Sequence, residues 1–186
     1  MKAGVLALQG DFREHAAVLA DLGVSPVLVR TPADLAEVDC LAIPGGESTT
    51  IGRLARRHGL VEPIRDRAGS GMPVLGTCAG MIVMAREVVD GESLLRLMDV
   101  RVARNAYGRQ VDSFEAEVPF ESRAEPLRGV FIRAPVVESV GEDVEVLARM
   151  DGRPVACEQG SLLAASFHPE LVGEGRLHRR LLEKVD

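Results

Sequence analysis

The stretch Pro73-Val74-Leu75-Gly76-Thr77-Cys78-Ala79-Gly80 joins a short apolar run to a cysteine with a glycine close by on either side. An apolar run followed by the pattern Gly-x-Cys-x-Gly is typical of a nucleophile elbow, a tight turn from a β-strand into a helix. Because glycine has no Cβ, Gly76 and Gly80 let the backbone bend sharply around the cysteine. The pattern predicts a buried strand, a turn, and Cys78 at the N-terminus of a helix.

Cys78 has the sequence surroundings of a reactive cysteine. The positive end of the helix dipole favours its thiolate, and the free amide of Ala79 can bind an oxyanion. Near the other end of the chain, an apolar run leads into Phe167-His168-Pro169-Glu170, which supplies a base and a carboxylate to orient it. A lone cysteine is more often a small buried residue, but the glycines and the His-Pro-Glu segment favour catalysis. Cys78, His168 and Glu170 therefore indicate a cysteine hydrolase.

The order of the expected elements predicts the fold class. Apolar runs of strand length occur first at residues 3–8, 26–29, 40–43 and 74–75. Helical stretches lie between them, at residues 12–22, from the Thr31-Pro32 start onward, and at 48–58. This alternation is typical of parallel strands joined by helices.

The second half of the chain has a different pattern. Extended segments follow one another at residues 99–102, 114–118, 129–133, 144–148, 154–158 and 162–166. Asp151-Gly152 predicts a hairpin turn, and a last helix is expected at about 175–184. We expect one α/β domain over residues 1–186, with three layers and a mostly parallel central sheet that carries an antiparallel extension.

Composition limits the class of protein. The chain has 186 residues, of which 46% are hydrophobic and 27% charged, as in ordinary globular domains. No run approaches the roughly twenty apolar residues that cross a bilayer, and no signal-peptide pattern is present, so we expect a cytoplasmic protein without membrane contact. The net charge of −6 disfavours nucleic acid as a partner.

Cysteine usage argues against a zinc site and against a disulfide framework. Cys40, Cys78 and Cys157 are widely separated and lack the spacing of zinc ligands or of a disulfide framework. We expect no metal and no cofactor. The remaining histidines are interpreted as helix residues without a catalytic role; these are His15, His58 and His178.

A second glycine-rich connection is expected beside the elbow. Pro44-Gly45-Gly46-Glu47-Ser48-Thr49 joins an expected strand to a helix, and ligands of open α/β sheets bind at the carboxyl ends of the strands. A bare Gly-Gly pair is also common in plain tight turns. Facing the elbow, however, the amide of Gly46 becomes a natural second oxyanion donor beside that of Ala79. No Gly-Lys-Ser/Thr follows, so Walker-type phosphate binding is a poor match.

Six segments occur in the order seen in one family: Leu8-Gln9-Gly10-Asp11, Pro44 to Thr49, Gly76 to Met81, Arg104-Asn105-Ala106-Tyr107-Gly108-Arg109-Gln110, Phe131-Ile132-Arg133-Ala134-Pro135 and Phe167 to Leu171. On these motifs the chain resembles the glutaminase subunits of pyridoxal 5′-phosphate synthase, which are class I, triad-type glutamine amidotransferases with a flavodoxin-like domain. The resemblance covers nearly the whole chain and is weakest at residues 172–176.

The resemblance implies a reaction and a substrate. Cys78 would attack the side-chain carboxamide of L-glutamine, and hydrolysis of the thioester would then give glutamate and ammonia. In the family, glutamine is held at positions that match Gly46, Glu47, Ser48, Arg104, Ile132 and Arg133. Taken alone, Arg104 would be read as a solvated surface arginine and Glu47 as a helix-start carboxylate.

The resemblance also implies a partner. The ammonia would pass to a separate synthase subunit in a hetero-oligomer, and Gln9 would lie at the docking face, although it could also be a plain turn residue. Three alternatives remain open at this stage. They are the glutaminase subunit of another pathway, such as imidazole glycerol phosphate synthase; a related cysteine peptidase or chaperone-like hydrolase; and a non-catalytic regulatory subunit.

Overall fold

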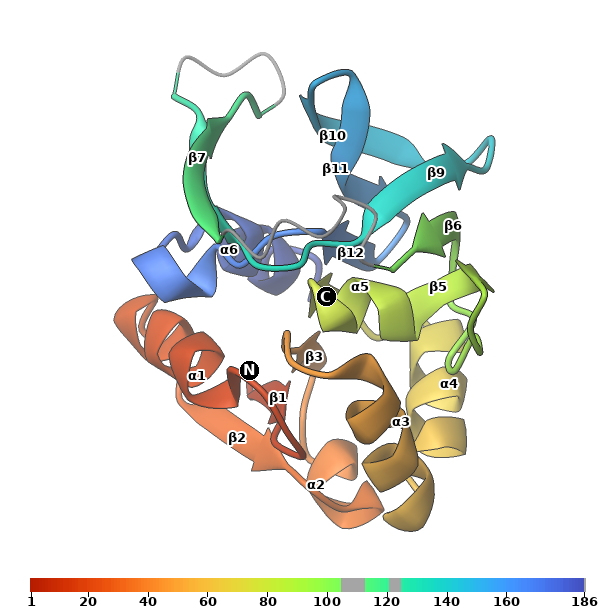
Figure 1. The fold of residues 1–186 in the computed structure, drawn as a ribbon. Coiled ribbons are helices and arrows are strands. Elements are labelled where there is room, and N and C mark those ends of the chain that lie inside the picture. Colours follow the sequence, from red (N-terminus) through yellow and green to blue (C-terminus); the bar gives the residue numbers. More distant parts are fainter. Residues whose placement is uncertain (105–112, 121–124, 186) are drawn as a thin grey trace.

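The computed structural model describes residues 1–104, 113–120 and 125–185. Five strands form the parallel part of a central sheet: β1 (Ala3–Leu6), β2 (Pro26–Val29), β3 (Cys40–Ile43), β4 (Val74–Thr77) and β12 (Leu162–Ala165). They lie in the order β2-β1-β3-β4-β12, which is the 2-1-3-4-5 order of flavodoxin-like folds (Figure 1). The antiparallel strands β11 (Arg153–Gln159) and β10 (Glu145–Met150) extend the sheet beyond β12. The predicted fold class is confirmed.

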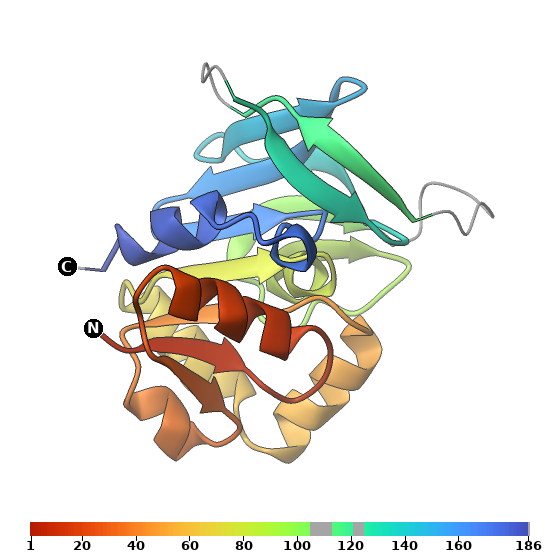
Figure 2. The ribbon, with the colours of Figure 1, turned by 90° about the vertical axis from the view of Figure 1, so that its left-hand side faces the viewer.

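Helices cover both faces of this sheet. Figure 2 shows α1 (Phe12–Asp21) and α6 (Arg176–Leu182) side by side on one face. The other face carries α2 (Pro32–Ala36), α3 (Ser48–Arg57), α4 (Val61–Gly69) and α5 (Ala79–Met84). Alternate residues of one strand enter the two cores: in β3, Leu41 and Ile43 pack under α3 and α4, whereas Cys40 and Ala42 pack with Leu19 of α1. The result is the expected three-layer arrangement.

Local signals explain several element boundaries. Thr31 and Asp34 form a reciprocal capping box, with Pro32 in the first turn, so α2 begins where the sequence predicted. The hairpin turn Asp151-Gly152 also forms, and both of its residues have positive φ. One predicted strand needs correction: β8 runs from Leu127 to Phe131 and not to Arg133, whose φ of 44° is incompatible with a strand.

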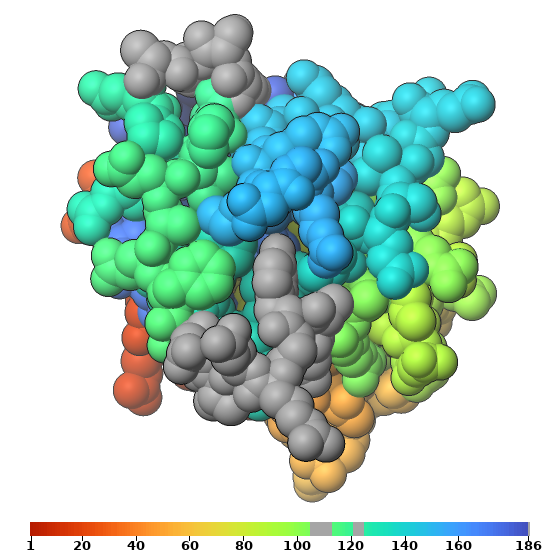
Figure 3. Space-filling model, turned by 45° about the horizontal axis from the view of Figure 1, so that its top comes forward, coloured from red at the N-terminus to blue at the C-terminus, as the bar shows by residue number. Residues whose placement is uncertain are grey.

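The remaining strands form two small sheets. One contains β5 (Ala85–Val89), β6 (Met98–Ala103) and β9 (Val136–Val140), and the other is the hairpin of β7 (Phe114–Val118) and β8. In the face seen in Figure 3, the β10–β11 hairpin lies between β7–β8 on one side and β9 on the other. Part of the predicted extension is therefore separate from the central sheet. In the described part of the chain, no helix combines the length and the apolar character that crossing a membrane requires.

Glycine allows α5 to lie directly against the end of β3. A Cβ built on Gly80 would stand 2.1 Å from the backbone oxygen of Ile43, and one on Gly76 would stand 2.7 Å from the backbone of Gly80. No side chain fits at either position. The elbow glycines thus serve packing as well as the bend, and they bring the start of α5 next to the loop that follows β3.

Replacing Gly80 with alanine is expected to lower the free energy of unfolding by about 1–3 kcal/mol, although alanine is the better helix former, because the new methyl group meets backbone. The matched control is Gly69→Ala in α4, where no atom lies within 4 Å of the added Cβ. That variant should be as stable as the wild type or slightly more so. Chemical denaturation of both variants measures the difference, and equal stabilities would contradict this account of the packing.

Candidate active site

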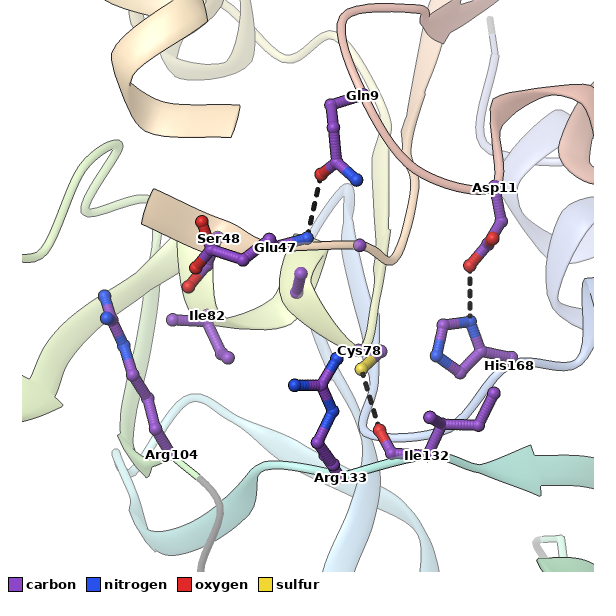
Figure 4. A pocket seen from close by; sticks show the side chains of 12 residues that line it. Gln9, Asp11, Glu47, Ser48, Cys78, Ile82, Arg104, Ile132, Arg133 and His168 are labelled. Carbon is purple, nitrogen blue, oxygen red and sulfur yellow. Dashed lines mark hydrogen bonds and ion pairs between the residues drawn. The ribbon is translucent and has the colours of Figure 1, made fainter. Parts of the chain in front are cut away.

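A pocket of about 370 Å³ opens where β1, β3, β4 and β12 end. It brings together residues from every motif of the sequence prediction that the structure describes (Figure 4). Its lining consists of Gln9, Asp11, Gly46, Glu47, Ser48, Cys78, Ala79, Ile82, Arg104, Ile132, Arg133 and His168. Glu170 does not line it and lies buried behind His168. The continuation of the Arg104 motif, residues 105–110, falls outside the described residues.

Cys78 stands at the turn between β4 and α5 in a strained conformation. Its φ of 48° and ψ of −105° are rare for a residue with a side chain, and they are the mark of a nucleophile elbow. Its backbone N–H donates to the carbonyl of Ala165 over 2.8 Å, which ties the elbow to β12. The Sγ atom lies 3.8 Å from the carbonyl oxygen of Ile132, to which the thiol donates. The elbow predicted from the sequence is present.

His168 is held through both its backbone and its ring. Its N–H and C=O pair with those of Val130 over 2.8 and 3.1 Å. The ring lies against Gly45, where a Cβ would stand 2.1 Å from Cε1. Nδ1 is 2.9 Å from Oε1 of Glu170 and 3.2 Å from Oδ2 of Asp11. Two carboxylates therefore select the tautomer with the proton on Nδ1.

Charges around the imidazole favour its protonated form. Burial would lower the pKa of His168, but its interactions with Asp11, Cys78 and Glu170 outweigh this effect and raise that pKa well above its usual value. Burial would likewise raise the pKa of Glu170, but the charges and hydrogen bonds of His15 and His168 lower it far below its usual value. The protonated imidazole can donate from Nε2, the ring nitrogen that is not held by the two carboxylates.

Asp11, His168 and Glu170 also satisfy a geometric condition for a metal site, since one ligand atom from each lies within 4.8 Å of the others. Their spacing is accounted for by the hydrogen bond between Nδ1 of His168 and Glu170 and by the ion pair between the same Nδ1 and Asp11. We therefore interpret the group as a histidine held between two carboxylates.

The loop after β1 clamps the loop after β3. The carbonyl of Gly45 accepts from the N–H of Asp11 over 3.1 Å, and Oε1 of Gln9 accepts from the N–H of Glu47 over 2.8 Å. Gly46 has a φ of 148°, a conformation that favours glycine. Because a trans peptide directs its C=O and N–H to opposite sides, the N–H of Gly46 points away from Asp11.

The predicted glutamine-binding residues have definite partners. The carboxylate of Glu47 accepts from the N–H groups of Thr49 and Thr50 and from the Thr50 hydroxyl, and these bonds, the hydroxyl foremost, lower its pKa to about 2. It thus caps α3. Arg104 donates from Nη1 to Oγ1 of Thr49 over 3.3 Å, while its buried Nε has no partner among the described residues. Ser48 is the first residue of α3.

Sequence reasoning missed several residues of this region. Asp11 and Ile82 line the pocket, and two buried histidines, His15 and His178, pack behind Glu170. Asp11 belongs to a segment that the sequence analysis singled out, but its approach to His168 depends on how two distant loops meet. The signal for His15 was its position on the apolar face of α1, three residues after Phe12 and four before Leu19.

Comparison with known proteins agrees with this geometry. Residues 5–186 match the SNO glutamine amidotransferase family. The chain belongs to this family. As an SNO glutamine amidotransferase it is an enzyme, and glutamine is the source of the nitrogen that it releases.

Its similarity to individual proteins extends over nearly the whole chain. It is 55% identical to "Pyridoxal 5′-phosphate synthase subunit PdxT" of Frankia alni, over 99% of this chain and 94% of that protein. Identity to the protein of the same name from Acidothermus cellulolyticus is 56%, over 95% and 90% of the two chains. A crystal structure of a glutamine amidotransferase superposes with a TM-score of 0.93 at 49% identity, covering 98% of each chain.

The second carboxylate at His168 yields a prediction about charge. Asp11→Asn keeps the shape of the side chain and removes its charge, so the pKa of His168 should fall by about one unit, because a nearby anion stabilises the imidazolium. Titration of ¹⁵N-histidine-labelled protein by NMR measures this directly. The control is Asp21→Asn, which removes the same charge from the exposed far end of α1. Identical titration of His168 in the wild type and Asp11→Asn would remove Asp11 from the site.

Proposed function

We propose that the chain is the glutaminase subunit of a pyridoxal 5′-phosphate synthase, and that Cys78, His168 and Glu170 carry out the hydrolysis of L-glutamine. The observation that carries the proposal is a strained elbow cysteine and an imidazole that line the same pocket, with a buried carboxylate 2.9 Å from Nδ1 of that imidazole. The names of the relatives support the pathway.

The proposed reaction uses Cys78 as the nucleophile, His168 as the acid and base, and Glu170 to orient His168. The Cys78 thiolate attacks the carboxamide carbon of glutamine, and the resulting oxyanion is stabilised by the N–H of Ala79 and, when it is directed inward, that of Gly46. His168 gives the proton of Nε2 to the departing ammonia, which leaves a γ-glutamyl thioester. His168 then takes a proton from water, the hydroxide attacks the thioester, and glutamate departs as the thiolate is restored. Glu170 holds Nδ1–H throughout.

Recognition of glutamine is assigned to the other lining residues. Arg104 lines the pocket, and its guanidinium group suits the α-carboxylate of glutamine. Glu47, Ser48 and the Ile132-Arg133 segment complete the proposed binding set with Gly46. The Glu47 carboxylate already accepts three hydrogen bonds as a helix cap. An α-ammonium group could therefore use only its remaining lone pairs.

The proposal includes a hetero-oligomer in which a synthase subunit receives the ammonia. Gln9 supports a link between docking and activity, because it lies in the loop after β1 and holds the amide of Glu47. Turning the Gly45-Gly46 peptide breaks the hydrogen bond from Asp11 to Gly45, so a partner has to replace that interaction. We also propose a cytoplasmic location, which is supported by three free, buried cysteines.

The nucleophile is tested by Cys78→Ala, which is expected to abolish glutamine hydrolysis and leave the fold intact. His168→Ala should lower kcat on the order of 10³-fold or more, as when one member of a cooperating triad is lost. Glutamate release is measured in the presence of the synthase subunit, with Cys157→Ala as the control at a buried cysteine of β11. Glutamate formation by Cys78→Ala at the wild-type rate would end the proposal.

The partner's role is tested by comparing the chain alone with the chain at saturating synthase subunit. One additional oxyanion donor is worth roughly 10²-fold in rate, so the partner should stimulate the wild type by about that factor. Gln9→Ala should lower the stimulated rate more than the basal rate. Gln159→Ala is the matched control, since Gln159 also accepts from a backbone N–H over 2.8 Å, that of Asp99, and lies outside the pocket. Equal wild-type rates under the two conditions contradict the activation.

A further inference from the structure

Two fully buried histidines stand behind the proposed triad, and the reaction described above does not use them. His15 on α1 and His178 on α6 are both 0% exposed. Nδ1 of His15 lies 2.8 Å from Nε2 of His178, which joins the two helices under the sheet. A buried imidazole is costly unless its nitrogens find partners, so the pair is held by specific contacts and not by packing alone.

The second nitrogen of His15 points to Glu170. Its Nε2 lies 3.0 Å from Oγ1 of Thr77 and 3.4 Å from Oε1 of Glu170. The Thr77 hydroxyl in turn donates to the same carboxylate oxygen over 3.3 Å. That oxygen is also the one bound by Nδ1 of His168. Donors from α1, β4 and the segment after β12 thus converge on one oxygen atom.

The ring nitrogens that carry protons in His15 and His178 can be assigned from the groups that these nitrogens contact. Burial, with the neighbouring His15, lowers the pKa of His178 to about 3, so His178 is neutral and carries one proton. Its Nδ1 has no partner among the described residues, and we therefore assign the proton to Nε2, where His15 accepts it. The proton of His15 is then on Nε2, facing Thr77 and Glu170.

We propose that His15 is a positioning residue for glutamine hydrolysis. His178 fixes its tautomer, and its Nε2–H holds the Glu170 carboxylate against Nδ1 of His168, both directly and through the Thr77 hydroxyl. The inference rests on the triad of the proposed function. A glutamate side chain has three rotatable bonds, and the groups that share its Oε1 with His168 restrict it to the rotamer that orients the base.

Two amide variants separate positioning from packing. In His15→Gln the amide reaches the place of Nε2 and can still donate to Thr77 and Glu170. In His15→Asn the shorter side chain reaches only the place of Nδ1, beside His178, and leaves Glu170 without this donor. We expect His15→Asn to lower kcat on the order of 10- to 100-fold, as when a group that orients a functional side chain is removed. The KM for glutamine should stay unchanged, and His15→Gln should recover most of the rate.

The pH profile supplies a second readout. Donors from His15 favour the charged carboxylate, so their loss raises the pKa of Glu170 and moves the acid limb of kcat to higher pH in His15→Asn. Assays contain the synthase subunit, and the exposed His58→Asn is the control. A wild-type kcat and pH profile in His15→Asn, or equal losses in the Asn and Gln variants, would overturn the inference.

Should His15→Asn fail to fold, Thr77→Val removes only the bridging hydroxyl and keeps the shape of the side chain. The inference expects the same direction of change in kcat and in the acid limb, at unchanged KM. Wild-type behaviour of Thr77→Val would then count against it. Activity that survives in Cys78→Ala would instead reject the triad itself, so the two failures are distinguishable.

Discussion

The hydrogen bond between Nδ1 of His168 and the buried carboxylate of Glu170, 2.9 Å long, connects the site to the fold. A carboxylate that is removed from water must be compensated, and Glu170 is compensated by groups from α1, β4 and the segment after β12. These elements have to be in register before the anion is stable in its place. The packing of the core therefore also determines the geometry of the catalytic groups in the pocket.

Much of the fold could be predicted because its signals are local. The capping box at Thr31, the apolar runs of β2 and β3, and the elbow around Cys78 each depend on neighbouring residues only. Helix α4 was missed because its N-cap, Leu60, offers no side-chain cap. Strands β5 and β9 were missed because both pair with β6 in a sheet whose formation is a tertiary event.

The residues of the site also divide into those with local sequence signals and those that depend on tertiary contacts. Residues in turns at the ends of parallel strands were predictable, since those ends meet at one edge of the sheet. Asp11 and His15 were not, because one depends on contact between two loops and the other on the meeting of α1 with Glu170. A histidine on the apolar face of a helix has no sequence signal that distinguishes a core residue from a partner of a distant carboxylate. Glu47 is the opposite case. Its position in the sequence predicts a carboxylate at a helix start, and in the structure it caps α3.

The backbone bridge between Val130 and His168 has a mechanical consequence. Strand β8 carries Val130, and the chain continues directly into Ile132 and Arg133 at the pocket wall. A tilt of the β7–β8 hairpin would therefore carry the imidazole and this part of the wall in the same direction. The base and this part of the wall are therefore fixed to the same hairpin, and the spacing between them does not depend on the rest of the pocket.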